Sequence, residues 1–339
     1  MQAASEQSVL GDFSGQTLQH FGAEARFFQS EQKFMVNIAG GDGSTKDFEI
    51  HWVFGVQPLQ QYLVDFPDGR KQVLPYCWDS RPADQGGQRW FHIHPDEAIP
   101  PGDLLHWTKP SQNWNYMCAE CHSTALKRSY DSGSDQFATQ YEEVNVSCEA
   151  CHGPGSGHVK WAESATGSSA KSTTNPSGTS AADMGLHALV DRDHAIWSID
   201  SETGKPTRTP TRTNHNQVQT CAPCHSRRSP LGDGSVPGGK FLDSYLPSLL
   251  DPMLYHADGQ IQDEVYVWGS FVQSRMHHEG VTCSDCHDPH SLKLKLPGDN
   301  LCLQCHPATT FASKEHHQHE STSCADCHMP ETTYMVVDP

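Results

Sequence analysis

The segment Gly280-Val-Thr-Cys283-Ser-Asp-Cys286-His287-Asp-Pro-His290 contains the pattern that decides the fold of this chain. At its centre, two cysteines are separated by two residues and followed directly by a histidine. Five other segments repeat this pattern, and no Cys-x-x-Cys pair in the chain lacks the histidine. In chain order we number them motif 1 (Cys118, Cys121, His122), motif 2 (Cys148, Cys151, His152), motif 3 (Cys221, Cys224, His225), motif 4 (Cys283, Cys286, His287), motif 5 (Cys302, Cys305, His306) and motif 6 (Cys324, Cys327, His328).

This spacing is the attachment signature of c-type haem, in which two thiols bond to the haem vinyl groups and the adjacent imidazole becomes the proximal iron ligand. A tetrahedral zinc site also accepts Cys-x-x-Cys pairs, but it gives no reason for a histidine at the next position every time. Redox-active dithiols occur singly, and structural disulfides need no following histidine. We therefore predict six covalently bound haem c groups. The remaining cysteine, Cys77, is expected to be a small buried apolar residue.

The composition agrees with a chain that builds its interior around cofactors. Only 35% of the 339 residues are apolar, so the sequence is poor in core-building side chains. Thirteen Phe, nine Tyr and eight Trp argue against disorder. Because six porphyrins would supply large apolar surfaces, we expect the haems themselves to form much of the core. No run of eighteen apolar residues is present, so we predict no transmembrane segment in this sequence.

The charge of the chain limits its partners. The formal net charge is −18, from 41 acidic and 23 basic residues. Nucleic acid is therefore not expected as a partner. Each oxidised haem with two neutral ligands adds one negative charge, which brings the loaded protein to about −24. We expect redox partner proteins with basic docking surfaces.

Histidines are numerous enough to give every iron a second imidazole. The chain has 22, of which the six motifs use six. We expect mostly bis-histidine ligation. His158 and His290 follow motifs 2 and 4 through short Gly/Pro-containing or Asp-Pro links, and the other candidates lie near motifs or in short predicted helices. The full set of distal candidates is His106, His158, His256, His278, His290, His316, His317 and His319. For each one alone, a surface or hydrogen-bonded histidine remains the alternative.

The fold class predicted is α+β with little regular structure. Residues 1–112 hold no motif and alternate apolar with polar residues around 25–29, 33–38, 47–54 and 72–74, which predicts an antiparallel β meander. Residues 113–339 form the predicted multihaem region, in which short helices and loops pack on haems. Its longest predicted helix runs from Asp263 to His277. The Ser/Thr/Ala/Gly-rich stretch 163–185 is expected to be a flexible loop.

The sequence resembles multihaem cytochromes of the cytochrome c-552/c-554 type, in particular bacterial forms with a tetratricopeptide tail. The matching stretches are Gly55-Val-Gln-Pro-Leu-Gln-Gln-Tyr-Leu, Trp78-Asp-Ser-Arg-Pro, Asn113-Trp-Asn-Tyr-Met with motif 1, Val146-Ser with motif 2 and Gly-Pro-Gly-Ser after it, the opening segment 280–290, and Cys327-His328-Met-Pro. The resemblance implies periplasmic electron transfer through closely packed haems. It also implies that His158, His256 and His290 are good candidates for distal ligands.

The resemblance leads to two further expectations. Similar proteins begin with a signal peptide and another motif and continue into more haem sites and helical repeats, so we expect this sequence to be a fragment or a processed form. Since haem is attached outside the cytoplasm, we expect a periplasmic or extracellular location.

Three functions fit these features. The favoured one is an electron carrier with no catalytic residue of its own. The second is an oxidoreductase acting on small nitrogen or sulfur compounds, which requires one five-coordinate haem. The third is a subunit of an extracellular cytochrome filament, in which other copies of the chain are the partners. Electron paramagnetic resonance distinguishes the first two, because an open iron is high-spin.

Overall fold

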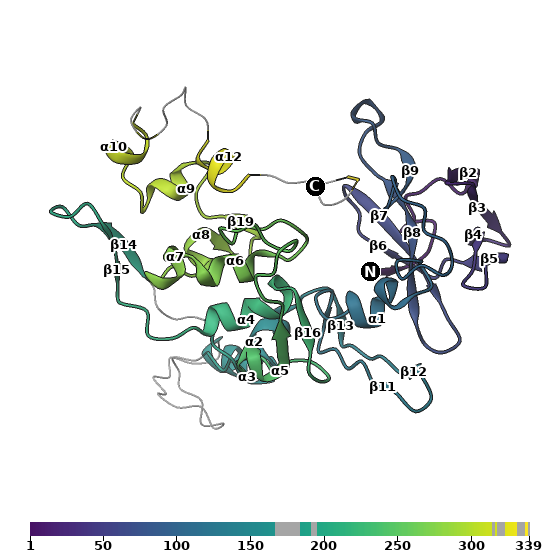
Figure 1. Cartoon of the computed structure of the whole chain (residues 1–339). Coiled ribbons are helices and arrows are strands. Elements are labelled where there is room, and N and C mark those ends of the chain that lie inside the picture. The colour runs from purple at the N-terminus through teal and green to yellow at the C-terminus, as the bar shows by residue number, and fades with distance from the viewer. Residues whose placement is uncertain (167–183, 191–194, 314–315, 317–322, 331–335, 338–339) are drawn as a thin grey trace. The chain divides into compact units, whose positions relative to one another are not determined.

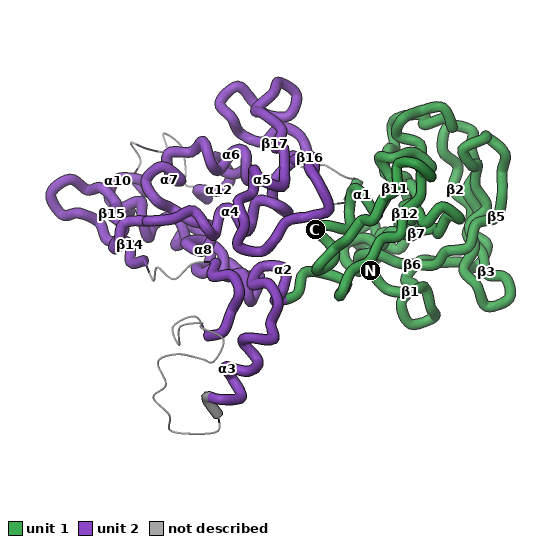
Figure 2. Tube along the Cα trace, turned by 90° about the horizontal axis from the view of Figure 1, so that it is seen from below, with its two compact units in different colours: residues 1–147, 333–339 green, residues 148–332 purple. Residues whose placement is uncertain are grey.

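The computed structural model describes residues 1–166, 184–190, 195–313, 316, 323–330 and 336–337 (Figure 1). The chain forms two compact units, unit 1 with residues 1–147 and 333–339, and unit 2 with residues 148–332 (Figure 2). The sequence predicts a division after residue 112. Unit 1 extends further, because the segment that carries motif 1 packs on the β-sheets. The α+β class with short, scattered elements is confirmed.

Unit 1 consists mainly of two antiparallel sheets. One has four strands in the order β2-β3-β4-β5, and the other has five in the order β1-β6-β7-β8-β9. Within each sheet, apart from β1, consecutive strands pair in sequence order, so the predicted antiparallel meander is present and is divided between two sheets. The strands are β1 (Gln2–Ala3), β2 (Ser14–His20), β3 (Ala23–Ser30), β4 (Lys33–Ala39), β5 (Thr45–Glu49), β6 (Trp52–Phe54), β7 (Leu59–Asp65), β8 (Lys71–Asp79) and β9 (Arg89–His92).

One predicted strand is divided in the structure. The sequence predicts a single strand over 47–54, but β5 ends at Glu49 and pairs with β4, whereas β6 begins at Trp52 and pairs with β7. Between them, Ile50 is buried and its amide donates to the carbonyl of Phe34 at 2.8 Å. The chain therefore crosses from one sheet to the other at this point.

Aromatic side chains form the core of unit 1. Phe13 contacts the rings of Phe27, Phe34, Tyr62 and Trp90 edge-on, with centroid distances of 5.1 to 6.1 Å. Phe27 and Trp90 stack at 3.7 Å. Aromatic residues bury large areas, and paired rings add about 0.5 to 1.5 kcal/mol beyond that area. Unit 1 thus has a conventional hydrophobic core.

Cys77 lies in this unit on strand β8, between β7 and β9. It is fully buried, as predicted, and packs with Phe91 and Val337. Burial raises the pKa of its thiol to about 12, because the thiolate is poorly solvated there. Cys77 is therefore a protonated core residue.

The remaining elements of unit 1 are short, and all except η1, which lies between β8 and β9, come after the two sheets in sequence. They are the 3-10 turns η1 (Ala83–Gln85) and η2 (Pro110–Gln112), the helix α1 (Trp114–Met117), and the strands β10 (Ser123–Thr124), β11 (Tyr130–Asp131), β12 (Gln136–Phe137) and β13 (Glu143–Val144). Strand β10 pairs with β13 and β11 with β12.

Unit 2 has short helices and two-stranded ribbons. The helices are α2 (Cys148–His152), α3 (Ser156–Thr166), α4 (Asn216–His225), α5 (Phe241–Ser244), α6 (Val267–Gln273), α7 (Arg275–His278), α8 (Cys283–Cys286), α9 (Asn300–Leu303), α10 (Ala308–Phe311) and α12 (Cys324–His328). The ribbons are formed by β14 (Ile196–Ile199) with β15 (Pro206–Thr209), β16 (Arg228–Pro230) with β17 (Tyr245–Pro247), and β18 (His287–Asp288) with β19 (Lys293–Leu294).

The structure corrects one prediction for unit 2 and describes only part of the segment that another prediction concerns. The predicted helix from Asp263 to His277 is two shorter helices, α6 and α7, because Ser274 is extended and its hydroxyl caps α7 by accepting from the amide of His277 at 3.2 Å. Of the predicted loop, residues 163–166 belong to α3 and residues 167–183 lie outside the described part. Among the described residues, no helix has the length and apolar character needed to cross a membrane.

Candidate functional site

In motifs 2, 3 and 6 the two cysteines and the histidine lie within one helix, α2, α4 and α12 respectively, and in motifs 1 and 5 they form one turn at the C-terminal end of α1 and α9. The amide of the histidine donates to the carbonyl of the first cysteine in motifs 1 and 5, at 3.2 and 3.0 Å. Residues at positions i, i+3 and i+4 of a helix share one face. Both thiols and the imidazole can therefore reach the same ring. Motif 4 differs, since α8 ends at Cys286 and His287 is extended.

Acidic residues inside two motifs fix the start of their helices. Asp285 accepts from the amide of Thr282 at 2.7 Å, and Asp326 accepts from the amide of Ser323 at 3.0 Å. Each acid is the third residue of its helix, so the contact is half of a capping box. Asp285 also accepts from the indole N–H of Trp197 at 2.9 Å. These contacts hold the first cysteine at a defined position.

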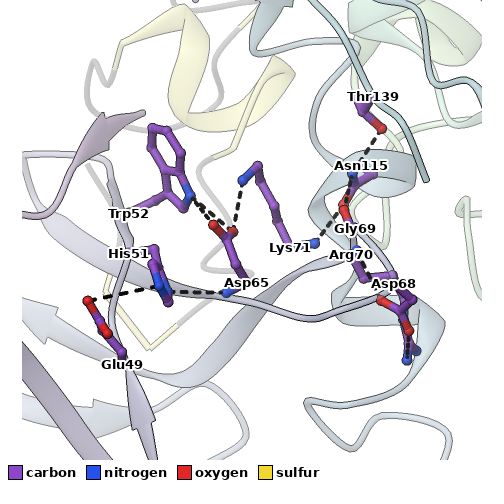
Figure 3. A network of polar contacts seen from close by, with 10 residues as sticks. All are labelled: Glu49, His51, Trp52, Asp65, Asp68, Gly69, Arg70, Lys71, Asn115 and Thr139. Carbon is purple, nitrogen blue, oxygen red and sulfur yellow. Dashed lines mark hydrogen bonds and ion pairs between the residues drawn. The ribbon is translucent and has the colours of Figure 1, made fainter. Parts of the chain in front are cut away.

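Motif 1 is held against the sheets of unit 1 by Asn115 of α1. Its side-chain oxygen accepts from the amide of Lys71 at 2.7 Å, and its side-chain nitrogen donates to the carbonyl of Gly69 at 3.1 Å and to Thr139 at 2.9 Å (Figure 3). Asn115 is almost fully buried. The network continues along the hairpin formed by β7 and β8, where Lys71 forms an ion pair with Asp65 at 2.8 Å. The β-sheets thus position the first attachment site.

Replacing Asn115 by Leu is expected to destabilise unit 1 by about 2 to 4 kcal/mol, since the almost fully buried Asn115 side chain loses its hydrogen bonds to Lys71, Gly69 and Thr139. Chemical denaturation of the loaded protein, followed by tryptophan fluorescence, measures the change. The exposed Gln16 of the same unit is the control, and its replacement by Ala should change the unfolding free energy by less than about 0.5 kcal/mol. Equal stability of the Asn115 variant and the parent would contradict the positioning role.

A buried ion pair lies beside motif 1. Glu120, between the two cysteines of the motif, pairs with Arg128, and both side chains are nearly inaccessible to solvent. Arg128 also lies over the ring of Tyr116, 5.6 Å from its centroid. Breaking such a pair leaves an uncompensated charge, which is strongly unfavourable. The pair therefore ties the motif to the strand region that follows it.

Two motif histidines in unit 2 face a second histidine. The ring centroids of His152 and His290 are 6.3 Å apart with an interplanar angle of 18°, and those of His328 and His316 are 6.2 Å apart with an angle of 14°. When one metal lies between two imidazole rings, about 2 Å from a nitrogen of each, the two ring centroids are about 6 Å apart. Both pairs therefore have the spacing of two axial ligands on one iron, and the residues present fit haem.

The chemistry of the motif histidines agrees with this fit. The Nδ1 of His152 lies 3.2 Å from the carbonyl of Ala188, a contact that leaves Nε2 to a metal. Burial lowers the pKa of His122 and of His225 below the ordinary value. Burial favours the neutral imidazole, and the neutral form is the one that binds a metal.

The motifs of unit 2 lie next to one another. Gln217, four residues before Cys221 of motif 3, accepts from the backbone amide of Ser284 in motif 4 at 2.7 Å, and Asp299, three residues before Cys302 of motif 5, accepts from the backbone amide of Cys324 of motif 6 at 2.9 Å. The side-chain nitrogen of Gln304, inside motif 5, donates to the backbone carbonyl of Asp285 in motif 4 at 3.2 Å. Attachment sites that are far apart in sequence thus form a continuous series from motif 3 to motif 6.

The other distal candidates lie in different surroundings. His158 is on α3, where its Nδ1 lies 2.7 Å from the carbonyl of Met184. His106 is buried in unit 1 with Nδ1 2.9 Å from the hydroxyl of Thr108. His256 lines a cavity of about 350 Å³ together with Leu250 and Met253. These three, and the exposed His278, remain predictions, and His317 and His319 lie outside the described residues.

A further histidine, His277, has surroundings that the sequence analysis did not single out. The Nδ1 of His277 lies 3.0 Å from the carbonyl of Val272, and its Nε2 is buried and without a hydrogen-bond partner among the described residues. Burial lowers its pKa, which favours the neutral form. The adjacent His278, which the sequence singled out, is exposed instead. Nothing in the sequence distinguishes the two, since only the helix orientation decides which ring is buried.

Comparisons with known proteins support a cytochrome. The family model described as cytochrome c554 and c-prime matches residues 104–153, which contain motifs 1 and 2. No curated protein matches the chain. Among solved structures, the outer cell wall cytochrome OcwA matches with a TM-score of 0.45 and 17% identity over 77% of this chain. The matched part is 56% of that structure's chain, so this chain spans little more than half its length. The family match supports a multihaem c-type cytochrome.

Proposed function

We propose that this protein is a periplasmic or extracellular electron carrier with six haem c groups, most of them ligated by two histidines. The observation that carries the proposal is the pair of facing imidazoles, His152 with His290 and His328 with His316, at 6.3 and 6.2 Å. In each pair one histidine belongs to an attachment motif and the other does not. An iron with imidazoles on both sides has no open position for a substrate.

The chain's own residues would hold each haem in the same way. The two cysteines of a motif would form the thioether bonds, the motif histidine would be the proximal ligand, and a histidine such as His290 or His316 would be the distal ligand. When bound, the haem supplies reversible one-electron chemistry of iron. The surrounding residues orient the imidazoles, as the contact between His152 and the carbonyl of Ala188 does.

The charge and the attachment chemistry support the location and the partners. Haem is attached through thioether bonds after a chain has been exported. The mature protein would therefore lie outside the cytoplasm. A formal net charge of −18, made more negative by oxidised haems, favours redox partners with basic docking surfaces. Association with such a partner should weaken as salt rises, because exposed charges are screened.

The carrier proposal is tested with the intact, haem-loaded protein. Its oxidised form is expected to give low-spin electron paramagnetic resonance signals, and its reduced form is expected to bind no carbon monoxide. It should also turn over no nitrite, hydroxylamine or tetrathionate with reduced viologen as donor. A high-spin signal together with reduction of one of these compounds would instead establish an enzyme with an open haem.

A further inference from the structure

The two sheets of unit 1 meet along a pair of edge strands. Strand β2 is an outermost strand of the four-stranded sheet and β9 is an outermost strand of the five-stranded sheet, and no ladder joins these two strands within residues 1–166, all of which the structure describes. An edge strand has backbone N–H and C=O groups that no neighbouring strand pairs. Side-chain contacts must therefore hold β2 against β9, and we call this boundary the β2–β9 seam.

One end of the seam is closed by contacts that acid does not affect. The indole N–H of Trp90 on β9 donates to the carbonyl of Asp12, just before β2, at 3.0 Å. The rings of Trp90 and Phe13 meet edge-on at 5.3 Å, and both residues are buried. None of these groups gains a proton in mild acid, so this end of the seam should stay closed there.

Three histidines close the other end of the seam. The rings of His20 on β2 and His92 at the end of β9 are stacked, with centroids 3.6 Å apart and an interplanar angle of 10°. Nε2 of His20 donates to the carbonyl of His94 at 2.7 Å, and the amide of His94 donates to Nδ1 of His92 at 3.0 Å. The second bond requires an unprotonated Nδ1, so the closed seam contains a neutral His92.

Protonation of His92 opposes this arrangement. Burial is the main cause that lowers the pKa of His92 to about 4, and the facing ring of His20 is the next. The carbonyl of His94, 3.1 Å from Nδ1, favours the charged ring, whereas the ring of His94 disfavours it. The phenol of Tyr76 on β8 also contacts His92, and burial raises the pKa of that phenol to about 12, so it carries no charge in acid. The charged groups that act on His92 are thus two other histidines, and both oppose its protonation.

We propose that the stacked pair of His20 and His92 is an acid-sensitive latch, and that protonation of His92 separates the two rings and releases the end of β2 from β9. A charged Nδ1 can no longer accept from the amide of His94, and it repels the facing ring when that ring is charged. In the released form His92 is solvated, so its pKa returns to about 6.5. Closure is therefore favoured most above about pH 6.5 and is lost as the pH falls towards about 4. The latch lies outside the six motifs, so this inference does not depend on the haem content.

The latch is tested by hydrogen–deuterium exchange of the full, haem-loaded protein at about pH 7.5 and about pH 5. Exchange is read by mass spectrometry with fragmentation of the peptides, and labelling times are adjusted for the intrinsic pH dependence of amide exchange. The amide of His94 loses its acceptor when the latch opens. Its corrected exchange should rise about thirty-fold in acid, as expected from a pKa of about 4 in the closed form and about 6.5 in the released form.

The extent of the opening is read from the strands. Residues 18–20 of β2 should lose protection over the same pH range, whereas β7, in the middle of the five-stranded sheet, should not. Motif 1 is held at β8 through Asn115 and not at the seam, so the visible spectrum of the haems should be unchanged. No rise at His94, or a rise that leaves β2 unchanged, would overturn the latch.

Two variants separate the charge from the contacts. In His92→Asn, the side-chain oxygen can accept from the amide two residues later and takes up no proton. The corrected exchange of His94 should then be equal at the two pH values. His20→Gln keeps a donor for the carbonyl of His94 but removes the facing ring. Because that ring helps to lower the pKa of His92, the rise in this variant should be smaller than in the parent.

His51→Asn is the matched control, since His51 lies in unit 1 beside Glu49 and outside the seam, and it should keep the parent response. A full acid response in His92→Asn, or a response in His20→Gln equal to that of the parent, would overturn the proposal. Should His92→Asn fail to fold, the responses of the parent and of His20→Gln decide between the two outcomes.

Discussion

Replacing His290 by Ala is expected to convert one iron of the oxidised protein from low-spin to high-spin. His290 faces His152 at 6.3 Å and its side chain is 83% exposed, so the substitution removes a ligand without opening a packed core. The freed position should bind carbon monoxide in the reduced protein and nitrite in the oxidised protein, whereas we expect the parent to bind neither. The effect should be complete at one haem and absent at the others.

Electron paramagnetic resonance quantifies this change, and intact mass shows that all haems remain attached. His316→Ala should give the same result at the haem of motif 6, because His316 faces His328. His51→Ala is the control, since His51 lies in unit 1 near Glu49 and Asp65 and outside the motifs. If His290→Ala retains only low-spin iron, the assignment of the distal ligand is wrong.

The second large effect is expected from the protein without haem. Expressed in the cytoplasm without a cytochrome c maturation system, unit 2 should be cleaved by protease as readily as an unfolded chain. The buried apolar residues described in unit 2 are few, namely Ala188, Val218, Ala222, Phe241, Tyr245, Tyr255 and Val265. Such a core cannot offset the conformational entropy of folding a unit of this length.

Unit 1 should behave differently under the same protease. Its largest core cluster holds fifteen buried residues, Phe27 and Trp90 among them. Each such side chain contributes about 1.5 to 3 kcal/mol when it is buried. Limited proteolysis with mass spectrometry should therefore leave a fragment that contains strands β2 to β9, while the haem-loaded protein resists cleavage in both units. A folded, cooperatively unfolding unit 2 without haem would contradict this account.

Much of the fold follows from local patterns in the sequence. The alternation around Phe27 and Val36 predicts strands that the structure contains, and Cys77 is buried as expected. The single predicted strand over 47–54 is wrong, because two sheets compete for it and the burial of Ile50 sends the chain from one to the other. Such a crossing depends on tertiary packing, which alternation alone does not encode.

The six motifs and their chemistry also follow from sequence, because covalent attachment requires a fixed spacing. The partners of the motif histidines do not follow in the same way. His290 lies three residues after His287 of motif 4, but its ring faces His152 of motif 2. His277 and His278 are neighbours in sequence, and helix orientation alone buries the first. Distal ligation, and the hydrogen bonds of Gln217 with Ser284 and of Asp299 with Cys324, depend on contacts between segments that are far apart in sequence.

The most direct test of the central claim is the number of haems bound covalently by one chain. The protein is produced with a cytochrome c maturation system, its haem is quantified by the pyridine haemochrome assay, and its intact mass is measured after denaturation. The account predicts six haem c groups per chain, all retained after extraction with acidified acetone. Zinc in place of iron, or haem that the acidified acetone removes, would contradict it.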